Sequence, residues 1–115
     1  MTREEQERIA AAVGCIEARL GEPLNLTAAA QEARYSKYHF HRLFAAAAGI
    51  TPHSYIRRRR LTEAARRLVF PREPVVEIAL AAGYQSQQAF ASVFRAMYKR
   101  TPGEYRREGF FSGHV

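Results

Sequence analysis

The feature that most constrains the fold of this 115-residue chain is an internal repeat. The same residues recur at an offset of 50 residues, and no gap is needed to align the two copies. The matched positions have the character of helix caps, buried aromatic residues and helix starts, so one backbone plan is predicted to occur twice. The matching pairs are Ala29 and Ala79, Ser36 and Ser86, Phe40 and Phe90, Phe44 and Phe94, Ala46 and Ala96, Thr51 and Thr101, Pro52 and Pro102, Tyr55 and Tyr105, and Arg57 and Arg107.

The first copy contains a helix that is apolar on one side only. Ser36 is a favourable N-cap residue for it. The apolar side repeats at i, i+3, i+4 and i+7, the spacing of one buried helical stripe, and comprises Phe40, Leu43, Phe44 and Ala47. The outward side comprises Lys37, Tyr38, His41, Arg42 and Ala45. Because this side combines cations, a hydrogen-bonding ring and a flat apolar surface, we expect the helix to enter a DNA groove.

The second copy has the same plan with a different outer side. Ser86 is its N-cap, and the inward residues are Phe90, Val93, Phe94 and Met97. The outward residues are Gln87, Gln88, Ala91, Ser92 and Arg95. Two copies of one scaffold with different outer sides would suit two helices that read different base sequences. A plain helical repeat protein is the alternative.

In each copy, a short helix and a tight turn precede this helix, which is the order of a helix-turn-helix motif. In the first copy, the short helix is expected over residues 28–33, with Thr27 as its cap. In the second copy, it is expected to begin after Pro71 and Pro74 and to stop at Gly83.

Two further helices are expected at the ends of the chain. Thr2 has the spacing of a capping box and can start the first helix, which Gly21 can end. A last helix should start at Pro102 and run through Arg107. The tail, residues 109–115, is expected to fray.

A long helix should connect the two copies, because Thr51 and Pro52 form a helix start and the apolar stripe continues to about Val69. We therefore predict an all-α fold of about seven helices, with two helix-turn-helix subdomains joined by a long central helix. The predicted boundaries are residues 1–50 for the N-terminal subdomain, 51–70 for the linker helix and 71–115 for the C-terminal subdomain.

Charge is distributed unevenly along the chain. The net charge is +7 and the pI about 10.2, which indicates a polyanionic partner. Residues 1–33 contain three arginines and six glutamates, a net charge of −3, whereas residues 34–115 contain fifteen cations and five glutamates, a net charge of +10. The cationic part of the chain therefore begins where the first recurring helix begins.

The sequence does not indicate an enzyme, a metal site or a cofactor. Cys15 is the single cysteine, there is no aspartate, and neither a phosphate-binding loop nor a nucleophile elbow occurs. His39 and His41 would point about 200° apart on a helix and could not chelate one ion. No apolar run approaches the roughly 20 residues of a membrane span, and the acidic start is unlike a signal peptide. We expect a cytoplasmic protein with no membrane partner.

These motifs resemble the DNA-binding domain of the AraC/XylS family of bacterial transcription regulators, and within it the MarA, SoxS and Rob group. The resemblance covers roughly residues 6–108 and rests on residues 35–44, 83–90, 94–95 and 101–107. It implies two helix-turn-helix units joined by a long helix. It also implies that both recognition helices enter the major groove on one face of bent DNA, one helical turn of about 34 Å apart.

The resemblance also implies which residues contact DNA. The positions at which the family contacts base edges are Tyr38, His41, Arg42, Gln87, Gln88 and Ala89. Arg42 could form a bidentate contact with guanine, and each glutamine could do so with adenine. Close relatives have Trp, Gln and Arg where this chain has Tyr38, His41 and Ser92. Contacts with the DNA backbone are expected from helix N-termini and cations, namely Ser36, Lys37, Arg58, Ser86, Ser92, Arg95, Arg106 and Arg107.

We therefore expect a monomeric, sequence-specific regulator that binds double-stranded promoter DNA. The resemblance alone further implies an activator that engages RNA polymerase near its site. Two alternatives stay open at this point: a non-specific architectural nucleic-acid binder, and a helical protein-interaction module that has only the fold.

Overall fold

The computed structural model of the chain describes residues 1–23, 26–70 and 72–112, with side chains as far as Glu108. These residues form helices and no strand, which confirms the predicted all-α fold. Pro71, expected to break the chain, and residues 113–115 of the expected tail lie outside the described residues. The helices are α1 (Arg3–Ala18), α2 (Leu26–Glu32), α3 (Lys37–Ala48), α4 (Pro52–Leu68), α5 (Val75–Ala81), α6 (Gln87–Tyr98) and α7 (Pro102–Ser112).

Packing divides the chain into two compact units, Met1–Arg58 and Arg59–Val115, called unit 1 and unit 2 below. The division falls inside α4, so the first part of this helix belongs to unit 1 and the second part to unit 2. The predicted organisation, with residues 51–70 as a separate linker, stays a prediction.

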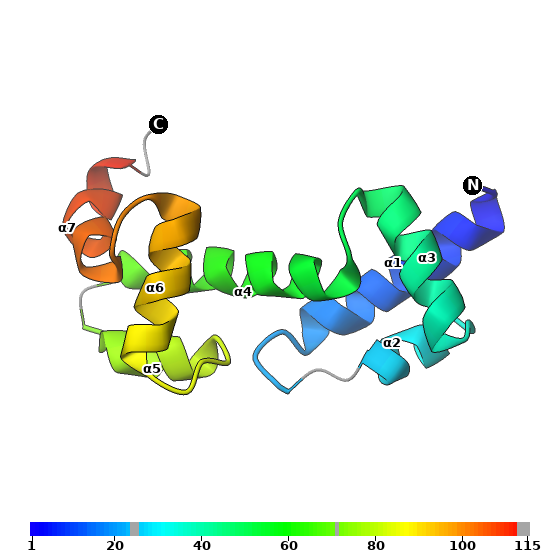
Figure 1. Ribbon diagram of the computed structural model, residues 1–115, viewed down its shortest axis with the longest axis horizontal. Coiled ribbons are helices and arrows are strands. Elements are labelled where there is room, and N and C mark those ends of the chain that lie inside the picture. Colours follow the sequence, from blue (N-terminus) through cyan, green and yellow to red (C-terminus); the bar gives the residue numbers. More distant parts are fainter. Residues whose placement is uncertain (24–25, 71, 113–115) are drawn as a thin grey trace. The chain divides into compact units, whose positions relative to one another are not determined.

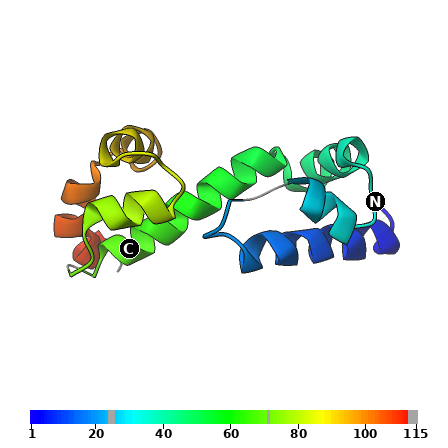
Figure 2. The same ribbon diagram turned by 90° about the horizontal axis from the view of Figure 1, so that it is seen from below.

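Unit 1 packs α1, α2, α3 and the first part of α4 around one core (Figures 1 and 2). α1 begins with the predicted capping box, in which the Thr2 hydroxyl accepts from the Glu5 N–H and the Glu5 carboxylate accepts from the Thr2 N–H. The Tyr55 hydroxyl donates to the Glu17 carboxylate at 2.9 Å and so ties α4 to α1. The buried residues are Ile9, Ala12, Ile16, Leu26, Ala29, Ala30, Ala33, Phe40, Phe44 and Ile56.

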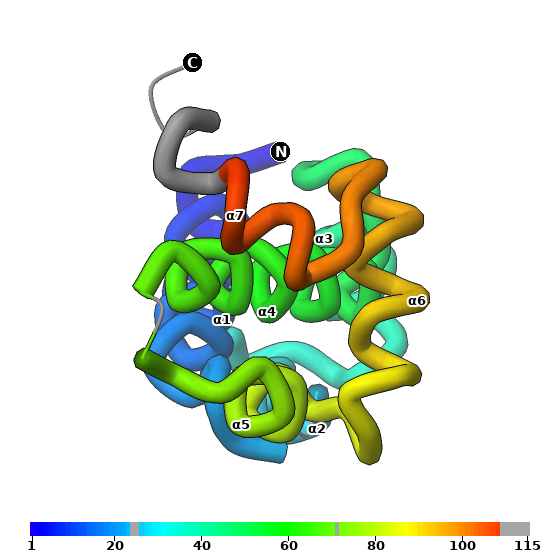
Figure 3. Tube along the Cα trace, turned by 90° about the vertical axis from the view of Figure 1, so that its left-hand side faces the viewer, coloured from blue at the N-terminus to red at the C-terminus, as the bar shows by residue number. Residues whose placement is uncertain are grey.

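Unit 2 repeats this arrangement with the second part of α4 and with α5, α6 and α7, which Figure 3 shows gathered around α4. The last core phenylalanine of α3 and that of α6 each contact a tyrosine of the following helix. The ring centroids of Phe44 and Tyr55 are 5.5 Å apart, and those of Phe94 and Tyr105 are 5.4 Å apart. The buried residues of unit 2 are Leu61, Ala64, Ala65, Leu68, Ile78, Ala79, Ala82, Phe90 and Phe94.

α4 contributes to both cores. Its first part packs in unit 1 through Ile56. Its second part supplies an apolar stripe to the core of unit 2, at the same i, i+3 and i+7 spacing as the stripe that α1 supplies to the core of unit 1. The stripe of α1 comprises Ile9, Ala12 and Ile16, and that of α4 comprises Leu61, Ala64 and Leu68. α4 is therefore both the last helix of one unit and the first helix of the next.

The prediction of a repeat without a gap is wrong by one residue. α2 and α5 are both seven residues long and start 49 residues apart, whereas α3 and α6 are both twelve residues long and start 50 residues apart. The extra residue lies in the second turn, where Gln85 separates Tyr84 from Ser86, whereas Tyr35 directly precedes Ser36 in the first turn.

The hydrogen bonds that close the two turns establish this register. The Tyr35 N–H donates to the carbonyl of Ala30 at 2.9 Å, and the Tyr84 N–H donates to the carbonyl of Ala79 at 3.1 Å. Ala79 therefore corresponds to Ala30 and not to Ala29. The sequence alone could not fix this register, because three consecutive alanines, residues 28–30, allow Ala79 to be aligned with either Ala29 or Ala30.

Some details of the predicted helices are also wrong. Ala47 and Met97, expected to face inward, are exposed, because each lies almost a full turn beyond the last core phenylalanine of its helix. Thr27 does not cap α2, because this helix already begins at Leu26. α7 continues past Arg107 to Ser112, since a single glycine weakens a helix without ending it.

Arg106 ties α7 to the end of α4. Its guanidinium donates to the carbonyl oxygens of Leu68 at 2.8 Å, Phe70 at 3.1 Å and Glu73 at 2.6 Å. The last carbonyls of a helix have no partner within the helix, and a cation is favourable at this negative end of the helix dipole. The guanidinium of Arg106, which the sequence predicts to contact the DNA backbone, thus stabilises unit 2 instead.

Replacing Arg106 by methionine should lower the free energy of unfolding by about 2 kcal/mol, because the three carbonyls would lose charge-assisted hydrogen bonds. Urea unfolding followed by circular dichroism would measure this change. The matched control is Arg107→Met, which alters the exposed neighbouring arginine and should change stability by less than about 0.5 kcal/mol. Equal stability of the two variants would contradict the structural role of Arg106.

Candidate nucleic-acid interface

The predicted recognition helix of unit 1, α3, is exposed along its outer side. Its N-terminus is capped by Ser36, whose hydroxyl accepts from the His39 N–H at 3.1 Å. Phe40 and Phe44 anchor its inner side in the core of unit 1. The predicted contact residues of this helix are all exposed, namely Ser36, Lys37, Tyr38, His41 and Arg42.

Tyr38 and Arg42 form a pair on this outer side. The guanidinium carbon of Arg42 lies 5.6 Å from the centroid of the Tyr38 ring, within the range of a cation–π contact. The Tyr38 side chain is 72% exposed, so the pair lies in solvent and not in the core. Within the described part of the chain, Arg42 has no hydrogen-bond or ion-pair partner, which leaves its donors available to a ligand.

α1 braces the start of α3. The Arg8 guanidinium carbon lies 5.1 Å from the centroid of the Tyr35 ring, and this ring centroid lies 4.6 Å from that of His39. Arg8 also donates to the Glu4 carboxylate at 2.7 Å. His39 therefore packs against Tyr35, a contact that the helical spacing of the two histidines does not predict.

The outer side of α6 carries smaller and mostly uncharged side chains. The Ser86 hydroxyl accepts from the Ala89 N–H at 3.0 Å, so both recognition helices have the same N-cap. Ala91 is half-buried. The predicted contact residues of this helix are exposed, namely Ser86, Gln87, Gln88, Ala89, Ser92 and Arg95.

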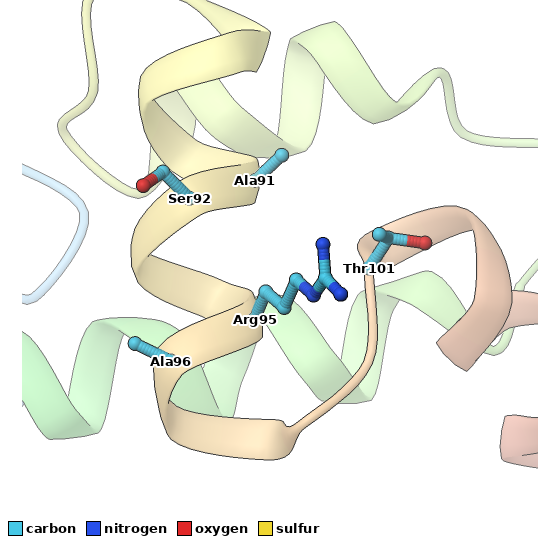
Figure 4. Close-up of a pocket in the computed structure, with 5 residues that line it drawn as sticks. All are labelled: Ala91, Ser92, Arg95, Ala96 and Thr101. Atoms are coloured by element: carbon cyan, nitrogen blue, oxygen red, sulfur yellow. The ribbon is translucent and has the colours of Figure 1, made fainter.

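A shallow hollow of about 580 Å³ lies between α6 and the start of α7 (Figure 4). It is lined by Ala91, Ser92, Arg95, Ala96 and Thr101, and the Arg95 side chain extends across it toward Thr101. The small side chains leave room beside the helix, and the guanidinium places a positive charge there. This combination can accept a strand of sugar and phosphate.

A capping box stabilises the start of α7. The Glu104 carboxylate accepts from the Thr101 N–H at 2.8 Å, and the Thr101 hydroxyl accepts from the Glu104 N–H at 3.1 Å. The hydrogen bond from the Thr101 backbone lowers the pKa of Glu104, and the positive charges of Arg95 and Arg107 contribute in the same direction. The Thr-x-x-Glu spacing of residues 101–104 is the sequence signal of this capping box.

The arginines of α4 are distributed around the helix as its geometry requires. Arg57 and Arg58 are exposed, whereas Arg59 and Arg60 are half-buried. The remaining predicted cation of unit 2, Arg107, is exposed on α7. Exposed cations thus occur on α3, α4, α6 and α7, whereas the donors of Arg106 are engaged within unit 2 as described above.

The described residues contain no group of three or more histidine, cysteine, aspartate or glutamate side chains that could hold a metal ion. Among the helices of residues 1–23, 26–70 and 72–112, none is both long enough and apolar enough to span a membrane.

Sequence comparison gives related regulators. A family described as a helix-turn-helix domain matches residues 29–108. The regulatory protein SoxS of Escherichia coli K12 is 39% identical over 94 residues, which cover 82% of this chain and 88% of SoxS. The Tn10 transposon protein TetD of Escherichia coli is 45% identical over 92 residues, which cover 80% of this chain and 67% of TetD.

Solved structures of similar fold are also transcription regulators. An AraC-type transcriptional regulator from Chromobacterium violaceum is 31% identical, with a TM-score of 0.84 over 93% of this chain and 96% of the other. The DNA-binding domain of AdpA, solved in complex with a target DNA, is 27% identical, with a TM-score of 0.78 over 87% of this chain and 90% of the other. The matched family, the identities and the shared fold show that this chain belongs to the AraC family of helix-turn-helix transcription regulators.

Proposed function

We propose that this sequence-specific DNA-binding regulator reads two segments of the major groove, one with α3 and one with α6. The observation that supports this most directly is the repetition of one capped helix. Ser36 and Ser86 each begin a twelve-residue helix that is anchored by two phenylalanines and exposes polar side chains on its outer side. Two such helices in one chain correspond to the two half-sites that a helix-turn-helix dimer reads.

In this proposal, α3 makes the charged base contacts. Arg42 donates two hydrogen bonds to the O6 and N7 atoms of guanine, and the Tyr38 ring packs against a thymine methyl group. His41, on the same exposed side, reaches a neighbouring base edge. Lys37 and the N-terminus at Ser36 bind phosphate.

α6 contributes neutral contacts in this proposal. Gln87 and Gln88 pair with adenine edges, and Ala89 contacts a thymine methyl group. Ser92 and Arg95 meet the sugar-phosphate strand in the hollow beside α6. The other proposed backbone contacts are the N-terminus at Ser86, Arg107 and, on α4, Arg58.

We propose that the protein binds as a monomer, because one chain already supplies two recognition helices. Its place of action would be the cytoplasm of a bacterium, where chromosomal DNA lies. The SoxS and TetD relatives are proteins of Escherichia coli.

We further propose that the regulator activates transcription by contacting RNA polymerase through α5. Val76 and Leu80 lie one turn apart on this helix and are 40% and 50% exposed, with the exposed Glu77 beside them. At the corresponding positions, 49 residues earlier, α2 has Thr27 and Gln31. The fold therefore does not require apolar residues there. Phosphate would repel Glu77, whereas a protein surface with apolar and cationic groups would fit this ridge.

The proposed function predicts a high specificity ratio. Affinity should be measured for a site selected from random DNA and for the same site scrambled, over a range of salt concentrations. The selected site should bind more than roughly 10³-fold more tightly. Equal affinities would favour the architectural binder, and no binding at low salt would leave the protein-interaction module. Analytical ultracentrifugation of the complex should give one chain per site.

Arg42 and Arg58 should differ in what they contribute to binding. Arg42→Ala should cost about 1 to 3 kcal/mol and remove the preference at one base position. Arg58→Ala should weaken binding to all sequences alike and lower the slope of log affinity against log salt by about one. Site selection with each variant would separate these effects. An unchanged selected motif for Arg42→Ala would contradict the base contact.

The α5 proposal predicts a loss of activation without a loss of DNA binding. The double variant Val76→Thr, Leu80→Gln introduces the residues of the matching positions in α2. It should lower reporter transcription at least about fivefold and leave the affinity for DNA within about twofold. The control variant Thr27→Ala, Gln31→Ala should change neither quantity. Unchanged transcription in the α5 variant would exclude this surface as the polymerase contact.

A further inference from the structure

We infer that Tyr38 is a positioning residue that orients the guanidinium of Arg42 before DNA is bound, so that the pair recognises guanine as one unit. This inference rests on the proposed contact between Arg42 and a base. To that contact it adds a source of affinity: the Arg42 side chain is already held in its binding orientation in the free protein.

The pair is arranged for such a role. Tyr38 and Arg42 are four residues apart on α3, the spacing at which side chains of neighbouring helical turns meet. The guanidinium carbon lies 5.6 Å from the ring centroid, so the negative face of the ring attracts the cation. A ring over the guanidinium leaves the N–H groups at its edge free to donate, and these are the groups that bind guanine.

The exposure of Tyr38 argues against a role in the core. Its side chain is 72% exposed, and the core of unit 1 is closed by other aromatic residues of α3, Phe40 and Phe44. Within the described residues, the contact with Arg42 is the one aromatic or ionic contact that Tyr38 makes. Tyr38 therefore contributes to the position of Arg42 and not to the packing of unit 1.

Order before binding has an energetic consequence. A free arginine side chain on a helix surface samples many rotamers, and this freedom is lost when the guanidinium docks on a base. Restriction by the Tyr38 ring reduces that loss of freedom. For one side chain, this reduction raises the affinity by up to about tenfold. The gain applies only where the oriented N–H groups meet guanine acceptors, so it appears as specificity.

Unit 2 offers an internal comparison. The residues of α6 that correspond to Tyr38 and Arg42 are Gln88 and Ser92, which cannot form a cation–π pair. At this position, unit 1 therefore has a guanidinium that is oriented by an aromatic ring, and unit 2 does not. The preference for guanine that depends on an aromatic partner should accordingly map to the half of the site that α3 reads.

The first measurement concerns the free protein. The ring current of Tyr38 should shift the nuclear magnetic resonance of the Arg42 Nε–H upfield. This shift should persist in Tyr38→Phe, which keeps the ring, and should disappear in Tyr38→Leu. The Nε–H resonance of Arg95, which lies on α6, serves as the control and should be the same in all three proteins. An Arg42 resonance that does not respond to the loss of the ring would overturn the positioning role.

The second measurement is a double-mutant cycle on DNA. Binding of the wild type, Tyr38→Leu, Arg42→Ala and the double variant is compared between the selected site and a site in which the guanine assigned to Arg42 is replaced by adenine. Tyr38→Leu should lower the preference for guanine about tenfold when Arg42 is present, and less than about twofold in the Arg42→Ala background. Tyr38→Phe should behave like the wild type.

The two possible failures are distinguishable. If Tyr38→Leu lowers the preference for guanine over adenine equally in both backgrounds, its effect does not pass through Arg42, and the positioning role is overturned while the base contact of Arg42 stands. If Arg42→Ala leaves the preference for guanine unchanged, the proposed base contact itself fails. Thermal melting of the four proteins should give the same midpoint within about 2 °C, because both side chains are exposed.

Discussion

Each unit of this protein depends on the packing of two phenylalanines, one turn apart on α3 or α6, against a tyrosine of the next helix. In unit 1 the centroids of Phe40 and Phe44 are 5.7 Å apart, and in unit 2 those of Phe90 and Phe94 are 5.4 Å apart. Burial of the two rings fixes which side of the helix faces inward. It thereby also fixes which side chains face outward. The outer residues can consequently change without affecting the core, and the different outer sides of α3 and α6 are the result.

The use of α4 in both units solves a problem of size. A core of three short helices buries little apolar surface, and small domains are marginally stable for that reason. Here each unit obtains a further helix without a further segment of chain, because residues on successive parts of α4 face different cores. Hydrogen bonds also hold both parts of α4. In the first part, the Tyr55 hydroxyl donates to the Glu17 carboxylate of α1, and at the end of the second part, the Leu68 carbonyl accepts from Arg106 of α7.

Helix caps and apolar spacing were sufficient to predict the fold, because these signals are local. Ser36, Ser86 and the phenylalanines at i and i+4 determined the recognition helices and most of their exposed residues. Three kinds of feature could not be predicted in this way. The register of α2 against α5 was ambiguous among alanines, the ends of helix stripes depend on where the core stops, and the partners of Arg106 lie more than thirty residues away in sequence. An arginine that binds carbonyls and one that binds phosphate have the same local pattern.

The single extra residue at Gln85 bears on how the protein could be rebuilt. The segments that begin at the two serine caps have equal length as far as the following Thr-Pro pair, so either could replace the other without changing the length of the chain. A complete helix-turn-helix segment, in contrast, would transfer its turn as well, and the two turns differ by one residue. Segments that begin at the serine caps can therefore be exchanged between the units without changing the turns, whereas exchange of whole helix-turn-helix motifs would change the length of each turn.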